Sequence, residues 1–174
     1  MHIDLDSFFV SVERKFNPEL IGKAIIIGGN AQRGVVASCS YEARQYGVHS
    51  GMSSRDAFKL CPHAISVRGN HHLYSEASAE VTKIIDDMVP LYQKASVDEF
   101  YIDLTGTDRF FNPYKLASEV RQRIIRETQL PISFGLGSSK TIAKMATNKA
   151  KPNGQLFIPQ GCEMQFLAPL PISA

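Results

Sequence analysis

The stretch SVDEFYIDL, residues 96–104, places Asp98 and Glu99 side by side in a segment that otherwise has the alternation of a half-buried β-strand. Apolar side chains occupy every second position after them: Phe100, Ile102 and Leu104. Successive side chains of a strand point to opposite faces, so one of the two carboxylates is expected on the apolar face. That position is unfavourable unless a cation lies nearby. A solvated hairpin tip is the alternative interpretation of this segment alone.

A second acidic segment, HIDLDSFF at residues 2–9, supports the interpretation that a cation lies near Asp98 and Glu99. Asp4 and Asp6 alternate with apolar residues and lead into a segment of helical spacing, for which Ser7 is the expected N-cap. One of these acids, placed beside the acidic pair of residues 96–104, would complete three carboxylates, a ligand set that suits Mg²⁺. The residues leave open which of the two it is, and either could instead be a charge near the positive end of the helix dipole.

The composition is that of an ordinary globular protein: 174 residues, 44% hydrophobic and 21% charged. The first residues carry acids where a secretory signal peptide needs basic residues and an apolar run, and no segment resembles a membrane span. We therefore expect a cytoplasmic protein with no membrane partner. Cys39, Cys61 and Cys162 are odd in number and far apart, which argues against a disulfide framework or a zinc site.

Basic residues are concentrated between Lys115 and Lys151, where eight lysines and arginines stand against two glutamates. Such a local positive field suits a polyanion such as a nucleotide or a nucleic acid. Helices with solvated basic faces would give the same count, so this feature alone does not decide between the two interpretations.

The order of the expected elements defines the fold class. Strands are expected at 1–5, 24–29, 34–40, 63–70, 132–139 and 155–160, a hairpin at 92–106, and helices at 7–16, 41–48, 54–62, 71–90, 113–130 and 140–151. Without residues 17–66, the order predicts an α+β fold in which helices cover one face of a mostly antiparallel sheet. Residues 17–66 then form a smaller inserted lobe.

Four segments in their order and spacing resemble the Y-family DNA polymerases, within them the DinB, or polymerase IV-like, branch: DLDSFFVSVE, SYEARQYGV, SVDEFYIDL and GLGSSKTIAKMATNKAKPNG. The resemblance covers nearly the whole chain. It implies a palm at 1–16 and 67–160 with a ferredoxin-like sheet, small α/β fingers at 17–66, and the start of a truncated thumb at 161–174. The implied activity is that of an error-prone, lesion-bypassing DNA polymerase, a nucleotidyltransferase that adds deoxynucleotides to a primer 3′-hydroxyl.

The resemblance also assigns the acids. It implies that Asp4, Asp98 and Glu99 are the catalytic residues and bind two Mg²⁺ ions, with the main-chain carbonyl of Leu5 as a further ligand. Two such ions stabilise both the attacking and the leaving oxygen of an in-line displacement.

Tyr41 and Arg44 lie three residues apart, on one face of an expected helix. A guanidinium makes paired, charge-assisted hydrogen bonds with phosphate oxygens. By similarity to the family, both contact the triphosphate of the incoming nucleotide, with Ser38 just upstream and Lys151 from the palm. Taken alone, Tyr41 would be interpreted as a packing residue and Arg44 as a surface residue.

Phe8 and Phe9 cannot both point into the core from one short helix, and Phe8 is the expected core residue. The resemblance implies that Phe9 is the steric gate, a ring that leaves no room for a ribose 2′-hydroxyl. Gly51 and Met52 match the part of the fingers over the nascent base pair. The missing side chain of Gly51 would leave an open template pocket, at a cost in fidelity.

The implied partners are primer–template DNA, deoxynucleoside triphosphates and, through regions that this chain lacks, a sliding clamp; a monomer is expected. The chain starts a few residues short of the family's usual first strand and stops where the thumb should begin. We therefore expect it to be weakly active or inactive alone.

Two other functions share features with this sequence. A truncated nucleotide-binding module would retain the nucleotide pocket without polymerisation. A diguanylate cyclase has a palm-like domain with a similar acidic first strand and a GGDEF hairpin, but SVDEF lacks both glycines.

Overall fold

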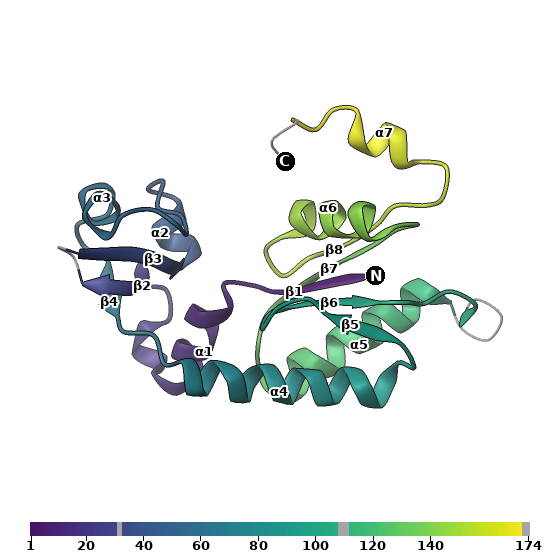
Figure 1. The fold of residues 1–174 in the computed structure, drawn as a ribbon, viewed down its shortest axis with the longest axis horizontal. Helices are drawn as coiled ribbons and strands as arrows, with labels where there is room; N and C mark the ends of the chain where they lie inside the picture. Colours follow the sequence, from purple (N-terminus) through teal and green to yellow (C-terminus); the bar gives the residue numbers. More distant parts are fainter. Residues whose placement is uncertain (31–32, 108–111, 172–174) are drawn as a thin grey trace. The chain divides into compact units, whose positions relative to one another are not determined.

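The computed structural model describes residues 1–30, 33–107 and 112–171 (Figure 1). The chain divides into two compact units: Met1–Asp6 with Ala77–Ala174 form the first, and Ser7–Glu76 form the second. The boundaries expected for palm, fingers and thumb stay a prediction. Three pieces of those segments, 31–32, 108–111 and 172–174, lie outside the described residues.

The first unit contains a five-stranded sheet in the order β5-β6-β1-β7-β8. Neighbouring strands are antiparallel except for the parallel pair β7 and β8. The central position of β1 explains its four buried residues. The strand bounds are β1 His2–Leu5, β5 Tyr92–Lys94, β6 Glu99–Ile102, β7 Ile132–Leu136 and β8 Gln155–Phe157.

Helices cover both faces of this sheet. Figure 1 shows α6 (Lys140–Ala150) on one side and α4 (His71–Met88) and α5 (Pro113–Thr128) on the other. Gly135 faces α6 so closely that a Cβ there would lie 2.1 Å from the carbonyl oxygen of Ala143. Its neighbour Phe134 points the opposite way, toward Tyr114 of α5. The α+β class predicted from the sequence is confirmed, but the prediction that the helices share one face is wrong.

The second unit contains a three-stranded sheet in the order β3-β2-β4. Ile26 of β2 packs in one apolar cluster with residues of α2 and α3, whereas Ile25 and Ile27 pack on the other side with Val10 of α1. Successive side chains of β2 point to opposite faces of the sheet, so they contribute to two separate small cores. The bounds are α1 Phe8–Phe16, a 3₁₀ turn at Pro18–Leu20, β2 Ile25–Asn30, β3 Arg33–Cys39, α2 Tyr41–Arg44, α3 Ser54–Leu60 and β4 Ile65–Val67.

The helix ends show where local sequence rules hold. The Ser139 hydroxyl accepts a hydrogen bond from the amide of Ile142 and caps α6, which ends before Pro152 as expected. Ser7 precedes α1 as predicted, but it adopts a left-handed conformation (φ 43°) and its side chain makes no capping hydrogen bond. That part of the prediction is wrong.

Three further features are the helix that follows the sheet, the state of the cysteines and the character of the helices as possible membrane spans. A short helix, α7 (Glu163–Leu167), follows the sheet, and two of its residues pack against α6. The three cysteines are unpaired, as expected. Within the described residues, no helix combines the length and apolar character that a membrane crossing needs.

Candidate active site

The acidic residues meet where β1 and β6 pair. Asp4 lies directly opposite Glu99 in the antiparallel register, and the Leu5 amide donates to the main-chain carbonyl of Asp98 over 3.0 Å. The side chains of Asp4 and Glu99 point to the α6 face of the sheet, since both bind lysines of the α6 segment. Carboxylates from two segments that are far apart in sequence, Asp4 in one and the adjacent pair Asp98 and Glu99 in the other, are thus brought together at β1 and β6.

Asp98 is not a strand residue. It ends the turn between β5 and β6, it is half-buried, and one carboxylate oxygen accepts a hydrogen bond from the Ser96 hydroxyl at 2.6 Å. The sequence predicts both acids inside the strand and one of them on the face of Phe100. That prediction is wrong, because β6 begins at Glu99 and Glu99 lies on the face opposite Phe100.

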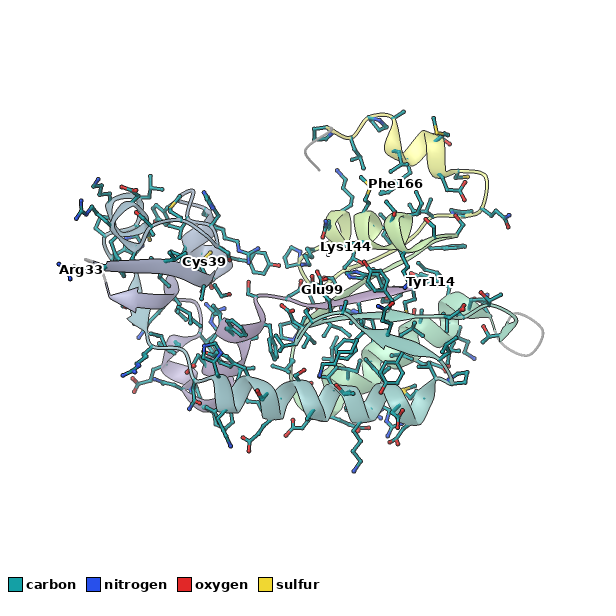
Figure 2. The ribbon with its side chains drawn as sticks, in the orientation of Figure 1. Arg33, Cys39, Glu99, Tyr114, Lys144 and Phe166 are labelled. Carbon is teal, nitrogen blue, oxygen red and sulfur yellow. The ribbon has the colours of Figure 1, made fainter. Side chains whose placement is uncertain are left out.

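Each of the two strand carboxylates has an ammonium partner. Lys151 Nζ lies 2.6 Å from Asp4 Oδ2. Lys144 Nζ lies 3.0 and 2.9 Å from the two carboxylate oxygens of Glu99, and Figure 2 labels both of these residues. Burial raises the pKa of Asp4 to about 6 in spite of Lys151, which lowers it, and the charges of Asp98 and Glu99 act in the same direction as burial. Burial also disfavours ionised Glu99, but the hydrogen bond and charge of Lys144 hold its pKa below the usual value.

The donor chemistry of this cluster fits divalent cations. In the described part of the chain, no three His, Cys, Asp or Glu side chains already enclose a metal-sized space. However, two ammonium groups stand at the carboxylates of Asp4 and Glu99, which shows that these oxygens accept cations. Carboxylate oxygens are the ligands that hard cations such as Mg²⁺ prefer.

Asp6 has a different environment from Asp4. It is only 1% exposed, and its Oδ2 accepts hydrogen bonds from the Ser133 hydroxyl and the Asn153 amide, each at 2.8 Å. Arg121 also binds the carbonyl and side chain of Asn153. Asp6 therefore ties the turn after Lys151 to β7, which fits a structural role.

Replacing Asp6 by alanine should lower the free energy of unfolding by about 3 kcal/mol, because a buried Ser133 hydroxyl and the Asn153 amide lose a charged acceptor. Urea unfolding of the chain measures this. Asp86→Ala, at an exposed position of α4, is the matched control and should change stability by less than about 0.5 kcal/mol. Equal effects of the two substitutions would contradict the structural role of Asp6.

His2 belongs to the same cluster, although no sequence motif points to it. Its side chain is fully buried, and Nδ1 lies 2.9 Å from the hydroxyl of Thr147 on α6. Burial lowers the pKa of His2 to about 4, so the ring is neutral at pH 7. Its Nε2, 3.9 Å from Glu99, therefore makes a polar contact and no ion pair.

The second unit holds the expected gate residue. Phe8 is buried, as predicted, whereas Phe9 is partly buried and stacks on the ring of Tyr74, with centroids 4.2 Å apart and planes 12° from parallel. The Tyr74 hydroxyl donates to Glu13 of α1 at 2.5 Å. Tyr74 thus fixes the orientation of the Phe9 ring. Sequence reasoning missed this residue, because nothing local links positions 65 residues apart.

The expected triphosphate contacts of the second unit lie on α2 and at the end of β3. Ser40 caps α2, and the guanidinium of Arg44 lies 4.8 Å above the ring centroid of Tyr41, so these two side chains share one side of the helix as predicted. Ser38 is buried in β3. Arg14 of α1 pairs with Glu42 at 2.9 Å, which holds α2 against α1.

Gly51 and Met52 lie in the loop that precedes α3. The amide of Gly51 donates to the carbonyl of Val36, and the amide of Val36 donates to the carbonyl of Met52, both at 2.9 Å. Gly51 has φ +85°, and a Cβ at this position would meet no atom within 4 Å. The loop is therefore anchored to β3 while the Gly51 position stays open.

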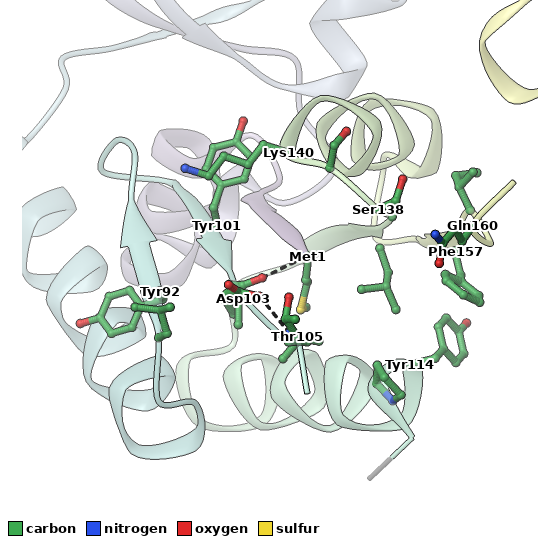
Figure 3. Close-up of a pocket in the computed structure, with 18 of the residues that line it drawn as sticks. Met1, Tyr92, Tyr101, Asp103, Thr105, Tyr114, Ser138, Lys140, Phe157 and Gln160 are labelled. Atoms are coloured by element: carbon green, nitrogen blue, oxygen red, sulfur yellow. Dashed lines mark hydrogen bonds between the residues drawn. The ribbon is translucent and has the colours of Figure 1, made fainter. Parts of the chain in front are cut away.

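A cavity lies elsewhere on the first unit (Figure 3). It measures about 860 Å³ and is lined by Met1, Tyr101, Tyr114 and Phe157 among others. None of the site residues predicted from the sequence belongs to its described lining. The two units carry the predicted residues separately: Asp4, Leu5, Asp98, Glu99 and Lys151 on the first, and Phe9, Ser38, Tyr41, Arg44, Gly51 and Met52 on the second.

Comparison with known proteins defines the class. The model of the impB/mucB/samB family matches residues 3–148. The chain belongs to this family, and its recognition as a palm-and-fingers portion of a Y-family DNA polymerase is confirmed.

Particular relatives agree with this class. The chain is 47% identical over 175 residues to a protein named DNA polymerase IV from Dehalococcoides mccartyi, a match that covers 99% of this chain and 45% of the relative. A DNA polymerase IV from Treponema denticola is 44% identical over 172 residues, covering 98% of this chain and 44% of the relative. The chain thus spans about half the length of the curated relatives it matches.

Solved structures show the same fold. The crystal structure of DinB from Sulfolobus solfataricus superposes with a TM-score of 0.92 at 31% identity, covering 99% of this chain and 51% of that one. The insertion ternary complex of Dbh DNA polymerase gives a TM-score of 0.90 at 30% identity, covering 99% of this chain and 52% of that one.

Proposed function

We propose that this chain forms the catalytic palm and nucleotide-binding fingers of a template-directed, translesion-type DNA polymerase. The observation that carries the proposal is the pairing of Asp4 with Glu99 on adjacent central strands, beside Asp98, within a chain of this family. The partners are primer–template DNA and deoxynucleoside triphosphates. A sliding clamp as further partner, a monomeric state and a cytoplasmic location stay predictions.

The acids would hold the metal ions. Asp4, Asp98 and Glu99, together with the main-chain carbonyl of Leu5, are proposed to bind two Mg²⁺ ions. When bound, such ions neutralise the charge that develops on the attacking and leaving oxygens. In the transfer itself, the primer 3′-oxygen loses its proton and forms a bond to the α-phosphorus, and the bond from that phosphorus to pyrophosphate breaks.

Residues of both the fingers and the palm would bind and select the nucleotide. Arg44 and Tyr41, with Ser38 and Lys151, are proposed to donate hydrogen bonds to triphosphate oxygens, since charge-assisted bonds of this kind both hold and orient phosphate. The Phe9 ring, kept in place by Tyr74, would exclude a ribose 2′-hydroxyl. The open position at Gly51 would admit altered template bases.

The experiment that tests the proposal uses a longer chain, in which this sequence is joined to the C-terminal half of the Dehalococcoides mccartyi relative. Primer extension and GTP cyclisation are assayed with the same preparation, with and without Mg²⁺. We expect template-directed extension that requires the metal. Cyclic dinucleotide formation would support a diguanylate cyclase instead, and nucleotide binding without extension would support a nucleotide-binding module.

The chain alone should bind primer–template DNA weakly, with a Kd in the non-specific range of about 10⁻⁴ to 10⁻⁶ M at physiological salt. Affinity for DNA depends on the number of phosphate contacts, and about half the length of the relatives has no counterpart in this chain. Fluorescence anisotropy with labelled primer–template at two salt concentrations measures this. A nanomolar Kd would show that the chain suffices to grip the duplex and would contradict the expectation.

A further inference from the structure

One face of the α6 segment carries a row of polar side chains that reaches across the acidic strands. Lys140, Lys144 and Thr147 follow one another at spacings of four and three residues, so they lie on the same side of the helix, and Lys151 comes directly after it. Each meets a different residue of β5, β6 or β1, in the order Gln93, Glu99, His2 and Asp4. The α6 segment therefore brings two ammonium groups to two of the three carboxylates proposed as metal ligands.

The contact of Lys144 with Glu99 uses both carboxylate oxygens. The distances of 3.0 and 2.9 Å place the ammonium between them, and the Lys144 side chain is 42% exposed while that of Glu99 is 23% exposed. A divalent cation that binds both oxygens of Glu99 from the same side would occupy the position of this ammonium and displace it. Lys144 and a metal ion therefore compete for the same carboxylate.

Lys144 is a better residue than Lys151 for a test of this competition, because its replacement changes a single proposed interaction. Lys151 pairs with Asp4 but is also a proposed triphosphate contact, so its replacement would change two properties at once. Lys144 has no assigned contact with nucleotide or DNA, and its described polar partner is Glu99. Asp4 and Asp98 add negative charge beside Glu99, so the cluster without a cation would repel itself.

We propose that Lys144 is an internal counter-ion. Its ammonium holds the Glu99 carboxylate in place in the absence of metal and releases it when a divalent cation binds. Metal binding is then an exchange of an ammonium for a metal ion, and its net affinity is reduced by the contact that is lost. The same exchange at Asp4 would free Lys151 for the triphosphate. This inference rests on the proposed function, because it assumes that Glu99 is a metal ligand.

The test measures binding of Mn²⁺ to the chain, without nucleotide, from the electron paramagnetic resonance signal of free Mn²⁺. Lys144→Met should bind Mn²⁺ about tenfold more tightly than wild type, because no ammonium then has to be displaced from Glu99. Lys149→Met, at an exposed position of the same helix, removes the same charge and should change the affinity by less than about twofold. In a Glu99→Gln background, Lys144→Met should have no further effect.

Thermal unfolding adds a second readout. Lys144→Met should have a lower Tm than Lys149→Met in metal-free buffer, and Mn²⁺ should raise the Tm of Lys144→Met by more than it raises that of wild type. Should Lys144→Met fail to fold, Lys144→Gln removes the charge but keeps a polar end and should show the same tighter binding.

The outcomes separate the inference from the function on which it rests. Unchanged or weaker Mn²⁺ binding by the Lys144 variants would overturn the counter-ion role and leave the metal site standing. Absence of Mn²⁺ binding by wild type, or the same binding by Glu99→Gln as by wild type, would overturn the metal site itself and the inference with it.

Discussion

Glu99→Gln, in the chain completed with the C-terminal half of the relative, is expected to lower the rate of primer extension by about a thousandfold or more, since it removes a proposed ligand of the ions that stabilise the transition state. Asp98→Asn and the alanine variants of both acids should behave alike. Single-turnover incorporation of one deoxynucleotide measures the rate. The fold should persist, because Glu99 lies at the edge of the buried core and half-buried Asp98 lies in a turn.

Glu119→Gln is the matched control for this prediction. Glu119 is exposed on α5, and its ion pair with Lys115 is long, at 3.9 Å. It should extend primers at the wild-type rate. Extension by Glu99→Gln within about tenfold of wild type, with the metal still required, would remove Glu99 from the catalytic set.

Phe9→Ala in the same completed chain is expected to raise the use of ribonucleotides relative to deoxynucleotides by about a hundredfold. The Phe9 ring is only partly buried and is held flat against Tyr74, so it can present its other face to a sugar. Removing the ring opens space for a 2′-hydroxyl. The ratio of kcat/KM values for matched ribo- and deoxyribonucleoside triphosphates measures the change.

Phe16→Ala serves as the control, because Phe16 belongs to the same helix and is 60% exposed. It should leave the sugar preference unchanged. An unchanged preference in Phe9→Ala would show that another residue forms the gate, and Tyr41 would be the first to examine.

Much of the fold follows from local patterns. The alternation around Ile25–Ile27 and Phe100–Ile102 predicts strands, and the helical spacing from Pro113 to Thr128 predicts α5. Local patterns do not say which face of a sheet each helix covers. Gly135 decides this for α6, because a Cβ at this position would lie 2.1 Å from the carbonyl oxygen of Ala143, a clash that only glycine avoids. In sequence alone, a glycine within a strand is equally typical of a bulge or a bend.

The sequence predicts those residues of the candidate site that the family motifs contain, but it does not predict which residues contact them. The motifs assign Asp4, Asp98 and Glu99, but the charge partners of these acids come from α6, and Lys144 is 45 residues from Glu99. In the sequence, Lys144 is one of eight basic residues between Lys115 and Lys151, and no motif gives it a specific role.

Three further residues show the same limit of sequence reasoning. Tyr74 and His2 were missed because stacking and burial depend on tertiary structure. The residue type of Ser7 predicts a cap, and its left-handed backbone has no local signature. Contacts between distant segments therefore had to come from the structure.

The central claim is that Asp4, Asp98 and Glu99 together bind divalent metal ions. Anomalous diffraction from crystals of the chain soaked in Mn²⁺ and a non-hydrolysable deoxynucleoside triphosphate tests it most directly. We expect Mn²⁺ at about 2 Å from carboxylate oxygens of these three residues, with the Lys144 ammonium displaced from Glu99. Anomalous peaks only at other positions, with Lys144 still on Glu99, would contradict it.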